Sequence, residues 1–130
     1  MDQGPLVREK VRAGRKFLSE FQKYRPIRVA FWLKNDEGEW SLYIASNQIT
    51  DENFDVAYGE VAQLAKAMRD PDFDAFQVRL IGEDDPIAQA ALRVPRLEPT
   101  LTPTRMYVAS FGGFPAQEVY IYPSSIPAPA

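Results

Sequence analysis

Residues 27–46 read IRVAFWLKNDEGEWSLYIAS, two apolar runs on either side of a polar loop at residues 35–38. Short apolar runs that flank a polar loop ending in glycine are typical of a β-hairpin. A loop of this length sets the pairing of the two strands and gives one face three wholly apolar pairs, which we expect in the core. These pairs are Val29 with Ile44, Phe31 with Leu42, and Leu33 with Trp40.

The other face of this hairpin has a mixed character. The same register produces three mixed pairs: Arg28 with Ala45, Ala30 with Tyr43, and Trp32 with Ser41. Near the C-terminus, four aromatic residues are expected to share one face: Tyr107, Phe111, Tyr120 and Tyr122. If no helix covers these aromatic side chains, they form a surface large enough to bind a partner. A covering helix is the other interpretation, and the sequence leaves both open. The candidate binding residues are Trp32, Tyr43, Tyr107, Tyr120 and Tyr122.

Hydrophobic periodicity predicts three helices and five strands along the chain. Two of the helices end before Pro26 and Pro71, because the residue that precedes a proline is pushed out of the helical region. We expect Thr50 and Asp85 to cap the second and third helices. The expected helices cover residues 6–24, 51–69 and 86–93, and the expected strands cover residues 27–34, 39–46, 75–81, 105–111 and 116–122.

The order helix–strand–strand–helix–strand–helix–strand–strand predicts an α+β fold, built as a two-layer α/β domain. The outer hairpins are antiparallel, whereas the central strand–helix–strand step implies a crossover between parallel strands. We therefore expect a five-stranded mixed sheet with helices packed on at least one face. Residues 1–122 are expected to form one domain, and the proline-rich residues 123–130 are expected to be a disordered tail.

The chain of 130 residues contains no histidine and no cysteine. On its own it therefore cannot form a Ser-His-Asp or Cys-His catalytic site, a thiol redox centre or a His/Cys zinc site. We expect no cofactor. The lack of cysteine, of a leader pattern after Met1 and of a long apolar run predicts a cytoplasmic protein that does not contact a membrane.

Positive charge gathers in residues 1–28, which hold eight basic and three acidic side chains, although the whole chain has a net charge of −3. On the first predicted helix, five basic residues fall within an arc of about 100°. They are Arg8, Arg12, Arg15, Lys16 and Lys23. Such a face can bind phosphates or an acidic partner, although a solvated helix face has the same pattern. Nucleic-acid binding through this helix is one hypothesis, which the acidic chain as a whole does not favour.

Three carboxylates, Glu83, Asp84 and Asp85, directly follow the third predicted strand. Ligands often bind at this position in sheets that contain parallel strands. A magnesium ion held there would make a carboxylate-based phosphoesterase. The alternative interpretation is a solvated turn in which Asp85 caps the next helix.

The leading functional hypothesis is a small non-enzymatic binding domain that self-associates or binds another protein. It would use the exposed sheet aromatics or the basic helix face, and a symmetric dimer is the simplest way to bury such a patch. The magnesium-dependent phosphoesterase and the nucleic-acid accessory protein are the alternatives. No residue is assigned a catalytic role.

Overall fold

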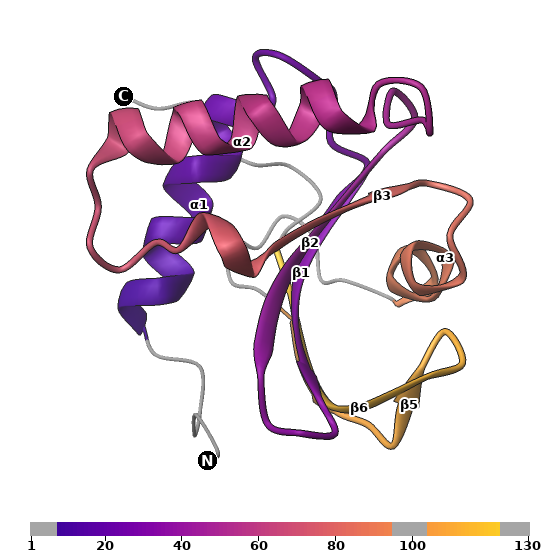
Figure 1. Cartoon of the computed structure of the whole chain (residues 1–130). Coiled ribbons are helices and arrows are strands. Elements are labelled where there is room, and N and C mark those ends of the chain that lie inside the picture. The colour runs from indigo at the N-terminus through magenta and orange to yellow at the C-terminus, as the bar shows by residue number, and fades with distance from the viewer. Residues whose placement is uncertain (1–7, 95–103, 123–130) are drawn as a thin grey trace.

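The computed structural model describes residues 8–94 and 104–122, and it contains both helices and strands (Figure 1). The predicted α+β class is confirmed. The elements are α1 (Arg8–Phe21), β1 (Val29–Asn35), β2 (Trp40–Ser46), α2 (Phe54–Met68), the short 3₁₀-helix η1 (Ala75–Gln77), β3 (Val78–Gly82), α3 (Pro86–Arg93), β4 (Thr104–Tyr107), β5 (Ser110–Phe111) and β6 (Phe114–Ile121).

The predicted five-stranded mixed sheet is confirmed, with the strand order β3-β2-β1-β6-β4. Strands β2 and β3 are parallel and are connected through α2, whereas the other neighbours are antiparallel. The short strand β5 pairs only with β6, outside this order. Helices α1 and α2 lie on one face of the sheet and α3 lies on the other (Figure 1), so the helices form a layer on both faces.

The predicted register of the first hairpin is wrong by one residue. The structure pairs Trp32 with Leu42 and Phe31 with Tyr43. The loop has three residues instead of four, because the backbone N–H of Asn35 donates to the carbonyl of Glu39 (2.9 Å) and Gly38 adopts a φ of 83°. A type I turn followed by a left-handed glycine is the usual way to close a three-residue hairpin loop.

A shift of one residue moves the partners of a strand to the opposite face of the sheet. Trp32 therefore packs with Leu42 in the core beneath α1 and α2, while Phe31 and Tyr43 face α3. Trp32 and Tyr43 therefore lie on opposite faces of the hairpin and do not share a surface. Helices cover both of these faces. The core under α1 and α2 contains Phe17, Leu18, Phe21, Trp32, Leu42 and Ile44, and the core under α3 contains Phe31, Leu33, Ala88, Ala91, Val119 and Ile121.

A buried chain of hydrogen bonds joins α1 to the sheet. Trp32 Nε1 donates to Tyr122 Oη (2.9 Å), and this hydroxyl donates to the backbone carbonyl of Val11 (2.7 Å). Gly14 faces the same hydroxyl, and a Cβ at this position would overlap the Tyr122 oxygen and lie 3.2 Å from Trp32 Nε1. The glycine thus allows α1 to approach the sheet closely.

The ionisation of Tyr122 should make the stability of the fold depend on pH. Burial raises the pKa of the Tyr122 phenol above its ordinary value of 10.0 and outweighs the opposing effects of Trp32 and Arg15. Because the folded-state pKa is the higher one, its contribution to stability is complete below about pH 10 and is lost as the pH rises above that value. We expect the free energy of unfolding to fall less steeply above about pH 10 in Tyr122→Phe than in the wild type. Urea titrations across this range would measure both slopes, and equal slopes would contradict the prediction.

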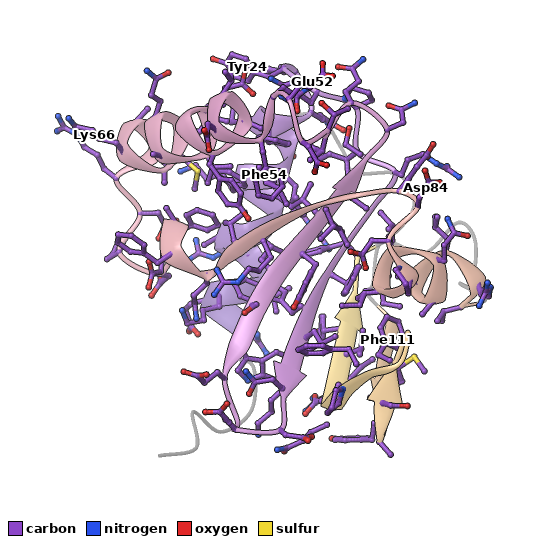
Figure 2. The ribbon with its side chains drawn as sticks, turned by 45° about the vertical axis from the view of Figure 1, so that its right-hand side comes forward. Tyr24, Glu52, Phe54, Lys66, Asp84 and Phe111 are labelled. Carbon is purple, nitrogen blue, oxygen red and sulfur yellow. The ribbon has the colours of Figure 1, made fainter. Side chains whose placement is uncertain are left out.

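Three other local predictions are corrected by the structure. Thr50 does not cap α2, because it exchanges hydrogen bonds with Asn53 and the chain makes a turn before the helix begins. The strand predicted over 75–81 begins only at Val78, because residues 75–77 form η1, where Phe76 is 89% exposed. The predicted strand over 105–111 is broken into β4 and β5, which places Phe111 on the α3 side of the sheet (Figure 2).

The predicted cap of the third helix is confirmed. The Asp85 side chain caps α3 by accepting a hydrogen bond from the Ile87 backbone N–H (2.9 Å). Gly112 and Gly113 turn the chain between β5 and β6 with φ values of 60° and 81°. The start of the first helix before residue 8 and the tail at 123–130 lie outside the described residues.

Candidate functional site

The predicted aromatic surface divides into buried and exposed residues. Trp32 and Tyr122 are about 1% exposed and belong to the core, so the covering-helix interpretation is correct for these two candidate binding residues. Tyr43 lies on the α3 face, stacked on Phe31 (5.3 Å between ring centroids), and burial raises its pKa. Tyr107 and Tyr120 remain together on the α1 side of the sheet, where Tyr107 is 75% exposed and Tyr120 is half-buried.

Tyr107 lies on the same face of β4 as Arg105, which comes two residues earlier in the strand. The Arg105 guanidinium lies 5.5 Å from the centroid of the Tyr107 ring, within the range of a cation–π contact. Arg105 Nε also donates to a carboxylate oxygen of Glu118 on β6, and this hydrogen bond raises the pKa of Arg105. The cation–π contact and the hydrogen bond together hold Arg105 beside the exposed ring of Tyr107.

The carboxylate that holds Arg105 beside Tyr107 is buried. Glu118 is only 5% exposed, and it is opposite Lys34 of β1 and opposite Tyr107 of β4. A buried charge is tolerated when it is paired and hydrogen-bonded, and Arg105 supplies that partner. The sequence-based site omitted Lys34, Arg105 and Glu118. The sequence did contain a signal for Lys34 and Glu118. Lys34 lies two residues after Trp32 and Glu118 lies four residues before Tyr122, so each charged side chain is on the same face of its strand as a buried aromatic residue.

The backbone of β4 has N–H and C=O groups that point away from β6, at the edge of the described sheet. The N–H of Tyr122 donates to the carbonyl of Ala30 in β1 (3.0 Å), and the N–H of Val108 donates to Gln117 (3.0 Å). Hydrogen-bonded and non-hydrogen-bonded pairs alternate along antiparallel strands. The N–H and C=O groups of Arg105 and Tyr107 therefore point away from β6. Within residues 8–94 and 104–122, no strand pairs with this outer edge.

The opposite edge of the sheet is protected by side chains. The N–H of Leu80 in β3 donates to the hydroxyl of Tyr58 from α2 (2.9 Å). The Arg79 guanidinium donates to the carbonyl of Val78 (3.2 Å). Proteins commonly block an edge strand in this manner to prevent pairing with another chain. The outer edge of β4, with Arg105 and Tyr107, has no strand beside it among the described residues, and we name it the β4 edge.

The basic face of α1 is partly neutralised by neighbouring carboxylates. Lys23 contacts Glu20 (3.2 Å), and Arg12 lies 3.9 Å from Asp72. Arg15 is half-buried and close enough to Tyr122 to affect its pKa. Arg8 and Lys16 are exposed, so the structure leaves a weaker positive surface than the helical arc predicts.

The three carboxylates after β3 do not converge on one point. Glu83 pairs with Arg28 (3.0 Å), Asp85 caps α3, and Asp84 is exposed in the loop between β3 and α3 (Figure 2). The described part of the chain contains no group of three or more Asp, Glu, His or Cys residues that could hold a metal ion. The proposed magnesium site therefore has no ligand set in the described residues.

A polar pocket of about 250 Å³ lies between the β1–β2 loop and η1. Most of its polar groups are used within the chain. Asn35 accepts from the N–H groups of Glu37 and Glu39, Asp74 accepts from Phe76, and Gln77 bonds with Lys10 and with the Trp40 carbonyl. These bonds explain the pocket as local structure around the hairpin loop.

Comparison with protein-family models, with curated proteins and with solved structures found no match. Among the described residues, none of the helices has both the length and the apolar character needed to cross a membrane.

Proposed function

We propose that the protein is a non-enzymatic interaction domain that binds a protein strand at the β4 edge. The observation that carries this proposal is the contrast between the two edges of the sheet. Side chains of Tyr58 and Arg79 occupy the β3 edge, whereas the backbone groups of Arg105 and Tyr107 point outward with no described partner. An added strand would satisfy these groups with main-chain hydrogen bonds.

The side chains on β4 suit a protein partner. Tyrosine and arginine are enriched among the residues that contribute most binding energy at protein interfaces. Tyr107 offers a largely exposed ring, and Arg105 is held against it by Glu118, so little side-chain freedom is lost when a partner binds. The phosphoesterase and nucleic-acid alternatives lack a comparable arrangement among the described residues.

Replacing Tyr107 by lysine should weaken binding at this edge. Lysine removes the aromatic ring and puts a second positive charge beside Arg105, and charged residues on edge strands oppose pairing. We expect the affinity for a captured protein, or for self-association, to fall by about tenfold, or roughly 1.4 kcal/mol. Sedimentation equilibrium and capture from a lysate of the organism that makes the protein would measure the change.

The matched control is Tyr24→Lys, because Tyr24 is also exposed (59%) but lies near the start of α2 (Figure 2). This variant should keep the wild-type affinity. If both variants retain every interaction of the wild type, the β4 edge is not the binding site and the proposal is wrong. Loss of binding in both variants would show that added charge acts without regard to position, which also contradicts the proposal.

A further inference from the structure

We infer that the strand bound at the β4 edge is β4 of a second copy of this chain, paired antiparallel about a twofold axis that passes through Met106. This inference rests on the proposed function, since it names the partner of the same edge. This pairing joins the five-stranded sheets of the two copies into one continuous sheet. The residues that carry it are Arg105, Met106 and Tyr107.

The spacing of the outward backbone groups favours this register. With Met106 on the axis, Arg105 lies opposite Tyr107 of the second copy, and each such pair can exchange two N–H···O bonds. All outward groups of β4 are then paired. A shift by one residue would place Arg105 opposite Met106, whose backbone groups already face β6.

The side chains select the same register. Arg105 and Tyr107 lie on one face of β4, and they already make a cation–π contact within one chain. In the proposed pairing each arginine faces a tyrosine of the second copy, so the contact is repeated across the axis. An axis through Arg105 would bring two arginines directly opposite one another, which is unfavourable. An axis through Tyr107 would place Arg105 opposite Ala109, beyond the end of β4.

Met106 provides a direct test, because the twofold axis places it opposite Met106 of the second copy in a non-hydrogen-bonded pair. Opposed Cα atoms in such pairs are about 4.5 Å apart, which is within the range that a disulfide spans. The chain contains no cysteine, so a single substitution introduces the only thiol. Met106→Cys should therefore form a disulfide-linked dimer under a mild oxidant such as oxidised glutathione.

The control is Ser110→Cys, an exposed residue in β5 that the twofold axis would hold far from its counterpart. We expect Met106→Cys to crosslink at least about tenfold faster than Ser110→Cys on non-reducing gels, and Tyr107→Lys in the Met106→Cys background to abolish the difference. Circular dichroism would show that each variant is folded. Equal rates for the two cysteine variants would overturn the proposed register.

Sedimentation equilibrium on the wild type tests the inference without any substitution. We expect a monomer–dimer equilibrium in the wild type. The dissociation constant of the dimer should be about tenfold higher in Tyr107→Lys, because the twofold axis repeats each lost cross-strand contact. A wild type that stays monomeric up to near-millimolar concentration would overturn self-pairing. If that monomer nevertheless captures another protein in a Tyr107-dependent manner, the proposed function stands and only the identity of the partner is wrong.

Discussion

Replacing Trp32 by alanine is expected to lower the free energy of unfolding by about 3–5 kcal/mol. Trp32 is about 1% exposed and fills the core between the sheet and α1. Its removal would leave a large cavity and would also remove the donor that binds the Tyr122 hydroxyl. A tryptophan on an open binding surface would lose far less stability, so this variant separates the two interpretations of the residue.

Urea or guanidinium denaturation, followed by circular dichroism, measures this change. Tyr24→Ala is the matched control, because its ring is exposed and its loss should change stability by less than about 0.5 kcal/mol. If Trp32→Ala unfolds at the same denaturant concentration as the wild type, Trp32 is not part of the core. The hairpin register described above would then be wrong.

Gly14→Ala is expected to destabilise the protein by about 1–3 kcal/mol, even though alanine is the better helix former by about 1 kcal/mol. The new Cβ would meet the buried Tyr122 hydroxyl, which is held between Trp32 and the Val11 carbonyl and cannot move freely. Gly59→Ala in α2 provides the control. No atom lies within 4 Å of a Cβ at that exposed position, so this substitution should stabilise the fold by about 0.5–1 kcal/mol.

A double-mutant cycle with Tyr122→Phe identifies the cause. Tyr122→Phe alone should cost about 1–3 kcal/mol, because it leaves Trp32 Nε1 and the Val11 carbonyl without the shared hydroxyl. It also removes the atom that the alanine Cβ would meet. The cost of Gly14→Ala should therefore be smaller in the Tyr122→Phe background than in the wild type. Additive costs would show that the hydroxyl is not the obstacle.

Local patterns in the sequence predicted the elements but not their exact pairing. The Asp85-Pro86 start of α3 has a local physical cause, and this prediction holds. The alternation of apolar residues placed strands in the right parts of the chain, although the strand predicted over 75–81 begins only at Val78. The register of the first hairpin depends on the left-handed conformation of Gly38. A four-residue and a three-residue loop both accept a glycine at that position, so composition alone could not decide between them.

The candidate site could be predicted only in part for a related reason. Tyr107, Tyr120 and Tyr122 do share a face, as expected, but Tyr122 is covered by α1 and Phe111 lies on the other face. Burial of an aromatic residue depends on which helix crosses it, and that is set by the order of strands in the sheet. The open state of the β4 edge likewise depends on strand order, which no local pattern in the sequence reveals.

The hydroxyl of Tyr58 and the guanidinium of Arg79 have a consequence for the size of any assembly. Because they block the β3 edge, a strand added to the described sheet could pair only at the β4 edge. Two copies joined through β4 would present a blocked β3 strand at each outer end. Growth would stop at two, and the same contact that permits pairing would not lead to open-ended fibres.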